Sequence, residues 1–288
     1  GKSVEIKRVG IVGSGIMGSG VAEVTAKAGF EVTLRSRTEK GAQSMMAGLE
    51  KSLAKQVEKG KLEDAERGAA QGRVRAVTDL EDLADCDLVL ESIVEDLPTK
   101  TELFAELDRI CGDGAILATN TSTLSVKAIA DATNRPDKVC GVHFFNPATV
   151  LPLVELVRAE QTSDETVESA RAFAESCGKT VVDVRDQAGF VVNALLFPYL
   201  NNAVKLLADG VASRDDIDAA MKGGCNFPMG PLELLDLVGL DTSLAIIEAL
   251  HTEFEDPNYE PAPMLRDLVK DGKLGRKSGA GFYDYAKK

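Results

Sequence analysis

Residues 8–18 read RVGIVGSGIMG, a glycine-rich turn that directly follows a short apolar run and directly precedes an amphipathic segment. The spacing G-x-G-x-x-G in this position is typical of a strand–turn–helix unit whose backbone binds a pyrophosphate. Gly13 permits the tight turn, Gly15 lets the backbone approach the ligand, and Gly18 allows close packing of helix on strand. Free N–H groups at the helix start are expected to hold the phosphates. The turn therefore predicts a dinucleotide-binding fold.

Short β-branched runs alternate with helical segments from the start of the chain to about residue 185. Eight strands are predicted over 9–12, 31–34, 73–76, 88–91, 115–118, 139–144, 153–157 and 180–184. Helices are predicted between them over 16–28, 40–59, 97–111, 126–131 and 164–176. This order of elements predicts an α/β fold of Rossmann type, with a doubly wound, mostly parallel sheet.

From residue 186 onwards the strand pattern stops and helical periodicity dominates. Helices are predicted over 190–208, 214–221, 231–237, 240–253 and 264–270, with turns at Gly223-Gly224 and at 256–258. We therefore predict two domains: residues 1–185 bind the dinucleotide, and residues 186–288 form an all-helical domain for substrate binding and dimerisation. A homodimer is expected because small helical domains rich in Leu, Val and Ile often supply dimer surfaces.

The composition narrows the classes of partner. The 288 residues carry a formal net charge of −13, so the chain repels phosphate polymers and is not expected to bind nucleic acid. The five irregularly spaced cysteines favour neither a disulfide framework nor a metal site and indicate a reducing, cytoplasmic setting. The longest apolar stretch, 190–207, is interrupted by polar residues and predicts a buried helix, with no membrane span. The first residues lack the apolar core of a signal peptide.

The end of the second predicted strand bears on the choice of nicotinamide nucleotide. A carboxylate usually stands there, about 20 residues after the glycine turn, and binds the ribose diol of NAD. This chain has Arg35-Ser36-Arg37 instead, with two guanidinium groups flanking a hydroxyl. Such donors suit a ribose 2′-phosphate, so NADP is predicted as the preferred cofactor, with NAD possible. The alternative is that both arginines are ordinary surface residues and that cofactor choice is relaxed.

Acid–base chemistry at neutral pH points first to histidine, and the chain has two. His143 closes a predicted strand, where the carboxyl ends of a doubly wound sheet meet the ligand. His251 lies in a predicted helix beside acidic residues and is interpreted as a surface or interface residue. Because a buried histidine can equally serve packing, the neighbours of His143 must decide its role.

Several segments resemble the short-chain (S)-3-hydroxyacyl-CoA dehydrogenase family, and within it the bacterial 3-hydroxybutyryl-CoA dehydrogenases. They are NTSTL at 120–124, HFFNP at 143–147, LVELV at 153–157, GFVVN at 189–193, PMGP at 228–231 and LGRKSGAGFY at 274–283. The resemblance runs nearly end to end, and ordered motifs are more specific together than any one alone. It implies that His143 is the general acid/base, that Glu155 is its partner, and that Ser122 and Asn193 contact the reacting oxygen.

These residue types suit the oxidation of a secondary alcohol. A base must take the hydroxyl proton while hydride leaves, and imidazole titrates near neutral pH. A carboxylate at Glu155, on the next strand, can fix the tautomer of His143 and stabilise the imidazolium. Ser122 and Asn193 are uncharged donors able to hold the reacting oxygen. Taken singly, each has a structural alternative: Ser122 as a helix cap, Glu155 as a surface residue and Asn193 at a helix start.

The resemblance extends to both ligands. Lys51, Lys55 and Lys59 recur at intervals of four along a predicted helix, and the first two are implied to bind the phosphates of an acyl-CoA, although a solvated helix face is the alternative. Glu95 resembles a position near the nicotinamide, with an unrelated loop carboxylate as its alternative. Substrate contacts are predicted at Lys51, Lys55, Ser122 and Asn193. The residues predicted to bind the cofactor are Gly13, Gly15, Ile16, Met17, Gly18, Arg35, Ser36, Arg37, Glu95 and Asn120.

We therefore predict an oxidoreductase of fatty acid metabolism, a 3-hydroxyacyl-CoA dehydrogenase that interconverts (S)-3-hydroxybutyryl-CoA and acetoacetyl-CoA with NADP(H). Two rivals remain: a hydroxy-acid dehydrogenase that acts on free acids, and a non-catalytic NADP-binding protein. Two positions depart from the family pattern, because Phe227 replaces a usual histidine and Ala194 a common arginine. These departures leave the acyl-chain length open.

Overall fold

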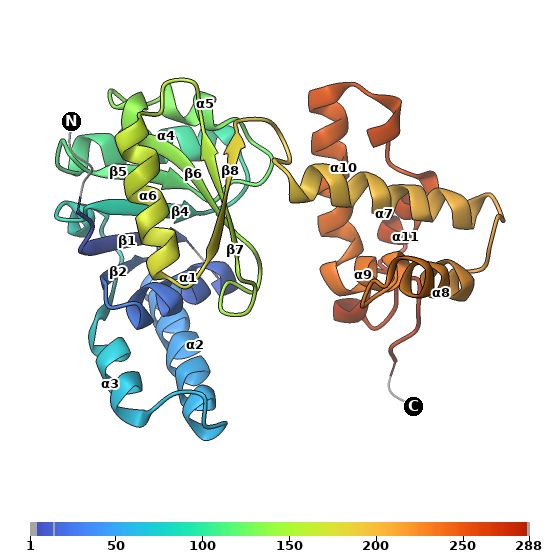
Figure 1. Cartoon of the computed structure of the whole chain (residues 1–288), viewed down its shortest axis with the longest axis horizontal. Helices are drawn as coiled ribbons and strands as arrows, with labels where there is room; N and C mark the ends of the chain where they lie inside the picture. The colour runs from blue at the N-terminus through green and yellow to red at the C-terminus, as the bar shows by residue number, and fades with distance from the viewer. Residues whose placement is uncertain (1–4, 14, 287–288) are drawn as a thin grey trace. The chain divides into compact units, whose positions relative to one another are not determined.

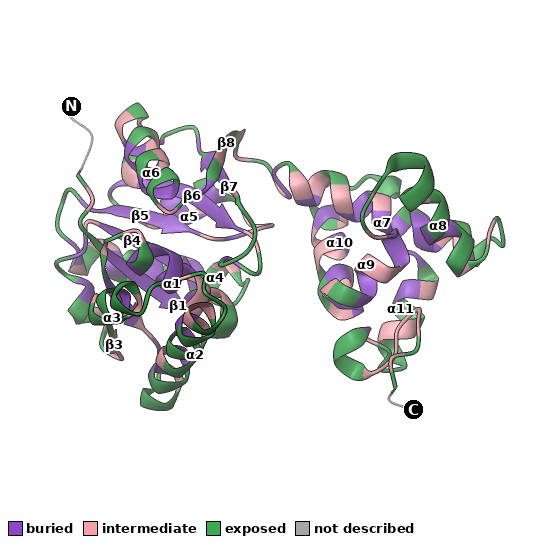
Figure 2. Cartoon of the chain, turned by 60° about the horizontal axis from the view of Figure 1, so that its bottom comes forward, coloured by how far each residue is buried: buried purple, intermediate pink, exposed green. Residues whose placement is uncertain are grey.

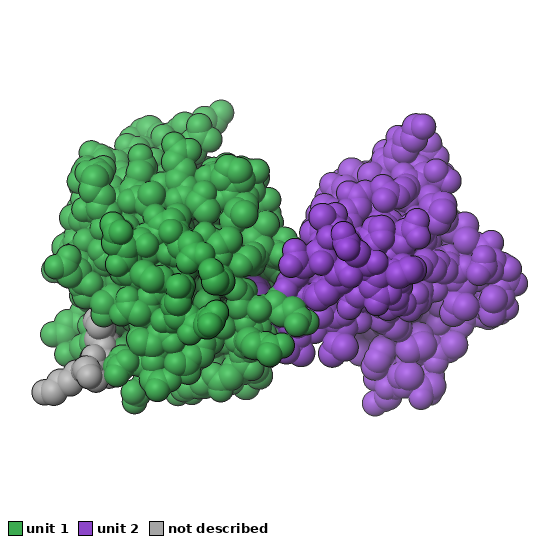
Figure 3. Space-filling view, turned by 90° about the horizontal axis from the view of Figure 1, so that it is seen from above, with its two compact units in different colours: residues 1–187 green, residues 188–288 purple. Residues whose placement is uncertain are grey.

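The computed structural model describes residues 5–13 and 15–286 of the chain. The chain divides into two compact units, Gly1–Gln187 and Ala188–Lys288, which carry different colours in Figure 3 and are described separately. None of the described helices has the length and apolar content needed to cross a membrane.

An eight-stranded sheet forms the centre of the first unit (Figure 1), in the order β3-β2-β1-β4-β5-β6-β7-β8. All neighbouring strands are parallel except β6 and β7, which are antiparallel. The order from β3 to β6 is that of a Rossmann sheet, so the predicted fold is confirmed. The strands are β1 Arg8–Gly13, β2 Glu31–Arg35, β3 Val74–Val77, β4 Leu88–Ser92, β5 Ile116–Thr119, β6 Val139–Phe144, β7 Leu153–Arg158 and β8 Thr180–Arg185.

Burial explains why the central strands are continuous apolar runs without a polar alternation. Almost every residue of β1, β4, β5 and β6 is buried, because helices cover the sheet (Figure 2). The helices of this unit are α1 Gly15–Lys27, α2 Glu39–Glu58, α3 Asp64–Gly72, α4 Leu97–Ile110, α5 Val126–Ala130 and α6 Asp164–Ser176. The sequence did not predict α3, since its nine residues include two glycines and bury only Ala70.

The second unit is helical throughout its named elements: α7 Val192–Ala208, α8 Arg214–Cys225, α9 Pro231–Val238, α10 Leu240–Phe254 and α11 Pro263–Lys270, with short 3₁₀ turns. Its core contains the fully buried Leu200, Leu232 and Leu250. The predicted turn at Gly223-Gly224 is wrong, because both glycines lie inside α8. The helix ends one residue later, where Asn226 adopts a left-handed conformation with φ of 57°.

Candidate active site

The glycine turn connects β1 to α1 at the carboxyl ends of the parallel strands. A Cβ on Gly13 would lie 2.5 Å from Ser92 Oγ, so a side chain does not fit at this position. Gly15 has a φ of 76°, and nothing lies within 4 Å of the place where its Cβ would be. The turn therefore combines a close strand contact at Gly13 with an open, left-handed backbone at Gly15.

The first turn of α1 presents the other predicted cofactor residues. Ile16 is 77% exposed, Met17 is half-buried, and a Cβ on Gly18 would lie 3.4 Å from Met45 Sδ of α2. The first N–H groups of a helix have no partner within the helix, and its dipole favours anions there. The open backbone at Gly15 and these N–H groups fit the pyrophosphate of a dinucleotide.

The predicted phosphate clamp lies at the end of β2. Arg35 is partly buried and its Nε donates to the Thr78 carbonyl oxygen at 3.0 Å, whereas Ser36 is buried and Arg37 is exposed. Burial lowers the pKa of Arg35, Glu106 opposes this shift, and Arg37 adds to it. The two guanidinium groups therefore repel each other at the strand end, and a bound anion would relieve that repulsion.

His143 and Glu155 lie directly opposite each other in the antiparallel pair of β6 and β7. Nδ1 of His143 lies 2.7 Å from Oε1 of Glu155, and the two residues are 6% and 0% exposed. Because a carboxylate only accepts hydrogen bonds, Nδ1 carries the proton and Nε2 is the basic nitrogen. The ring of Phe145 packs against the imidazole, with 4.5 Å between the ring centroids. Full burial excludes the alternative that Glu155 is a surface residue.

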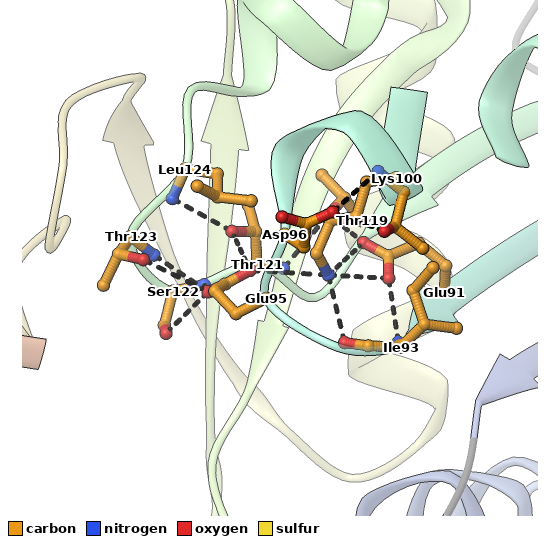
Figure 4. Close-up of polar contacts among 11 residues, drawn as sticks. Glu91, Ile93, Glu95, Asp96, Lys100, Thr119, Thr121, Ser122, Thr123 and Leu124 are labelled. Carbon is orange, nitrogen blue, oxygen red and sulfur yellow. Dashed lines mark hydrogen bonds and ion pairs between the residues drawn. The ribbon is translucent and has the colours of Figure 1, made fainter. Parts of the chain in front are cut away.

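Glu95, in the loop between β4 and α4, accepts several hydrogen bonds from the loop that follows β5 (Figure 4). Its carboxylate accepts from Thr121 Oγ1 at 2.7 Å, from Ser122 N at 2.8 Å and Oγ at 3.1 Å, and from Thr123 N at 3.2 Å. The Ser122 hydroxyl proton therefore points to Glu95, and Ser122 must turn to donate to a substrate oxygen. Ser122 is not a helix cap, because Ser125 caps α5.

A buried ion pair that the sequence did not predict lies next to Glu95. Lys100 Nζ of α4 lies 2.8 Å and 2.7 Å from the two carboxylate oxygens of Glu91 on β4, and the residues are 1% and 0% exposed. The same ammonium lies 3.4 Å from Glu95 Oε1. The sequence did hold one indication of this pair, a carboxylate inside the apolar run 88–92. A carboxylate in a buried strand must be paired with a cation or hydrogen-bonded.

The remaining residues that were predicted to bind cofactor or substrate lie on several different elements. Asn120 follows β5, and its Oδ1 accepts from Phe144 N at 2.7 Å, which ties the ends of β5 and β6 together. Lys51, Lys55 and Lys59 are exposed, the first two on α2 and the third at its C-cap. Asn193 belongs to the second unit, where it is buried in the first turn of α7.

A pocket of about 340 Å³ lies along α1 and α2. Small residues of both helices line it, among them Ser19 and Gly20 of α1 and Gly48 and Ser52 of α2, together with 147–149 of the loop after β6. Gly15 and Ile16 of the glycine turn also line this pocket. It therefore extends from the predicted cofactor turn toward the helix that carries the exposed lysines.

A histidine paired with a buried carboxylate, on the sheet edge that also holds an open glycine turn, is the arrangement expected of a nicotinamide-dependent dehydrogenase acting on an alcohol or ketone. Comparisons with known proteins give the family. The model of the 3-hydroxyacyl-CoA dehydrogenase NAD binding domain matches residues 8–187, and that of the 3-hydroxyacyl-CoA dehydrogenase C-terminal domain matches residues 189–285. The chain belongs to the 3-hydroxyacyl-CoA dehydrogenase family and is an NAD(P)-dependent oxidoreductase, as its motifs predicted.

Individual relatives cover nearly the whole chain. A 3-hydroxybutyryl-CoA dehydrogenase of Clostridioides difficile is 47% identical over 280 residues, which are 97% of this chain and 100% of the relative. The human mitochondrial hydroxyacyl-coenzyme A dehydrogenase is 42% identical over 291 residues, 99% of this chain and 93% of the relative. The crystal structure of (S)-3-hydroxybutyryl-CoA dehydrogenase from Ralstonia eutropha matches with a TM-score of 0.95 at 42% identity, covering 98% and 100% of the two chains.

Proposed function

We propose that this chain interconverts (S)-3-hydroxybutyryl-CoA and acetoacetyl-CoA, with NADP(H) preferred over NAD(H). The observation that carries the reaction is the 2.7 Å contact between His143 Nδ1 and Glu155 Oε1. Family membership supports an acyl-CoA substrate. The four-carbon chain is supported by the relatives from C. difficile and R. eutropha, whose names give 3-hydroxybutyryl-CoA as their substrate.

In the oxidative direction, Nε2 of His143 takes the proton of the substrate hydroxyl. The proton on Nδ1 stays in the hydrogen bond to Glu155, whose negative charge stabilises the imidazolium that forms. A bound nicotinamide ring supplies the acceptor of the hydride in this direction and its donor in the other. In the reductive direction, His143 begins protonated and gives its Nε2 proton to the carbonyl oxygen.

Ser122 and Asn193 remain the proposed contacts of the reacting oxygen. For Ser122, the contact requires the hydroxyl to rotate from Glu95 Oε2, 3.1 Å away, to the substrate. A rotation about one side-chain bond is enough, because the backbone N–H of Ser122 has its own bond to Glu95.

The preference for NADP rests on the end of β2. Arg35, Ser36 and Arg37 present two cations and a hydroxyl where an NAD-binding unit usually presents a carboxylate. The exposed Arg37 is able to reach a phosphate at the surface, and the partly buried Arg35 loses less side-chain freedom because Thr78 already holds it. Both features favour a ribose 2′-phosphate.

The pocket along α1 and α2 is the proposed path of the coenzyme A arm. Its small side chains leave room for a narrow chain, and the exposed Lys51 and Lys55 add positive charge to a chain whose formal net charge is −13. We also infer a homodimer through the second unit, whose exposed apolar side chains include Leu195, Leu206 and Val211 at 72%, 44% and 67% exposure.

The absorbance of the reduced nicotinamide provides the deciding test. We expect rapid oxidation of NADPH with acetoacetyl-CoA, slower oxidation of NADH at the same concentration, and little turnover of free acetoacetate. Equal rates with free acetoacetate would support the rival enzyme for free acids. Binding of NADPH without turnover of either substrate would support the non-catalytic rival. Sedimentation of the same preparation tests the inferred dimer.

A further inference from the structure

Four residues form a continuous polar chain from the buried interior to the loop after β5 (Figure 4). Glu91 of β4 holds Lys100 of α4 through both carboxylate oxygens. Lys100 Nζ lies 3.4 Å from Glu95 Oε1, and the other oxygen of Glu95 accepts from the N–H and the hydroxyl of Ser122. The inner end of this chain is fully buried, whereas 34% of the Glu95 side chain is exposed.

We propose that Glu91 and Lys100 are positioning residues, which hold the Glu95 carboxylate, and through it the Ser122 hydroxyl, in place for the reaction. The inference rests on the proposed function, because it gives Ser122 a contact with the reacting oxygen. Neither Glu91 nor Lys100 is required to touch the substrate for this role.

The contacts of Glu91 argue for a role beyond neutralising a buried lysine. Besides Lys100, Glu91 accepts from Ile93 N at 3.0 Å and from the Thr119 hydroxyl. Thr119 Oγ1 in turn accepts from Thr121 N at 3.0 Å. Glu91 therefore reaches the loop that carries Ser122 by two routes, one through Lys100 and Glu95, the other through Thr119 and Thr121. A shift of Glu91 would therefore change the positions of both Glu95 and Thr119, which bind neighbouring residues of that loop.

The charges around Glu95 keep it ionised. Burial raises the pKa of this carboxyl, but the Lys100 ammonium and hydrogen bonds from Thr121 and Ser122 lower it, and the net pKa is below its usual value. Among the described residues that contact Glu95, α4 supplies the cation and the loop after β5 supplies only hydroxyl and N–H donors. The charge of Glu91 is paired with Lys100, and the adjacent Asp96 is turned to the start of α4, where it accepts from Thr99 N.

Ionisation matters because it fixes the direction of the Ser122 hydrogen bond. A carboxylate can only accept, so the hydroxyl proton has one defined place from which it turns to the substrate. A protonated Glu95 is able to donate to Ser122 instead, which leaves the hydroxyl oriented arbitrarily. We therefore expect Lys100 to set the lowest pH at which the site works.

The test uses the reduction of acetoacetyl-CoA by NADPH between about pH 4.5 and pH 7, a range that spans the usual values for carboxyl and imidazole groups. In the reductive direction the protonated form of His143 is the active one. A loss of rate at low pH is therefore caused by the protonation of a different group, which we expect to be Glu95. We expect Lys100→Met to lower kcat about tenfold or more and to move the low-pH limb of the rate to higher pH. Lys100→Arg, which keeps the charge, should restore the limb to its original position.

The double variant Glu91→Gln with Lys100→Met separates positioning from stability. It removes both buried charges together, so it avoids the unpaired charge that either single variant leaves. We expect it to melt near the wild-type temperature while its kcat stays low and its limb stays shifted. Arg109→Met, which removes an exposed cation from the same helix, is the matched control and should leave kcat and the pH profile unchanged.

Two results overturn the inference. One is a double variant that regains the wild-type kcat and pH profile. The other is a set of variants whose activity falls only in proportion to the folded fraction seen by circular dichroism. A wild-type protein that does not reduce acetoacetyl-CoA defeats the proposed function instead, and the parallel wild-type measurement distinguishes that failure from these two.

Discussion

His143 Nδ1 and Glu155 Oε1 lie 2.7 Å apart because β6 and β7 are antiparallel and pair these two residues directly. Cross-strand partners in an antiparallel ladder have Cβ atoms about 5 Å apart, a separation that an imidazole and a carboxylate bridge without strain. The backbone ladder therefore sets the orientation of the imidazole, and the buried carboxylate favours the tautomer with the proton on Nδ1.

Replacing His143 by Gln tests the base. Glutamine fills a similar volume and can still bond to Glu155, so the variant should fold and bind the nucleotide. Its kcat should fall by about 10²- to 10⁴-fold, the usual contribution of a general acid or base. Stopped-flow or steady-state absorbance gives the rate, and His251→Gln in α10 is the control. Near-wild-type activity of the His143 variant would remove the assignment.

Replacing Glu155 by Gln tests the tautomer. The amide can donate to Nδ1, which favours the proton on Nε2 and leaves no base toward the substrate. We expect kcat in the oxidative direction to fall by about 10²-fold or more, with KM for the nucleotide little changed. Steady-state rates with (S)-3-hydroxybutyryl-CoA measure the effect. If kcat stays constant while both KM values rise, Glu155 serves binding and the assigned role is wrong.

The predicted preference for NADP over NAD is tested by a double variant. Arg35→Ala combined with Arg37→Ala should raise KM for NADPH about 10-fold or more, because each charged hydrogen bond contributes about 1.5–3 kcal/mol before losses to solvent. KM for NADH should change much less. Arg8→Ala, at the opposite end of β1 from the glycine turn, is the control for the loss of an arginine elsewhere in the sheet. Equal changes for both nucleotides contradict the predicted 2′-phosphate contact.

The lysines on α2 are tested through the substrate. Lys51→Ala with Lys55→Ala should raise KM for acetoacetyl-CoA several-fold and leave kcat nearly constant, because they are proposed to bind phosphates far from the reacting carbon. The increase should shrink as salt is added, since exposed charges are screened over about 10 Å at 0.1 M. Lys270→Ala in α11 is the control. If KM for acetoacetyl-CoA is unchanged in the double variant, the lysines belong to a solvated helix face and do not bind the substrate.

The reactivity of the thiols near pH 8 offers a test of the fold. Burial raises the pKa of Cys86 and of Cys140 to about 12, so both stay protonated and unreactive near pH 8. Cys225 is exposed. A chromogenic disulfide reagent should label about one thiol quickly, Cys225→Ser should remove that phase, and denaturant should release the others. Rapid labelling of Cys140 in the folded protein would contradict its position in β6.

Much of the first unit could be predicted, because its central strands are buried on both faces and read as apolar runs, and because the glycine turn marks where the first strand ends. The motifs also named His143 and Glu155, which the strand pairing brings together. The ion pair of Glu91 and Lys100 could not be predicted. Nothing in a strand sequence tells which distant side chain will neutralise a buried carboxylate, since that partner depends on how α4 packs.

Predictions from local sequence preferences were wrong where tertiary packing determined the backbone conformation. Glycines are poor helix formers, and the pair at 223–224 resembles a turn, yet α8 continues through both until Asn226 turns its backbone left-handed. Ser122 illustrates a different limit. Its sequence context allowed both a helix cap and a substrate contact, and only the folded structure shows that Glu95 accepts a hydrogen bond from its hydroxyl group.

The reversed direction of β7 has a consequence for engineering. Because hydrogen bonds of the strand ladder hold His143 and Glu155 in register, and Phe145 packs against the imidazole, residues 146–152 of the connecting segment are not needed to align the pair. Part of that segment, 147–149, borders the pocket proposed for the coenzyme arm. Substitutions at 147–149 should therefore change the affinity for the coenzyme part of the substrate while the hydrogen bond between His143 and Glu155 stays intact, which makes these residues the natural place to diversify a library.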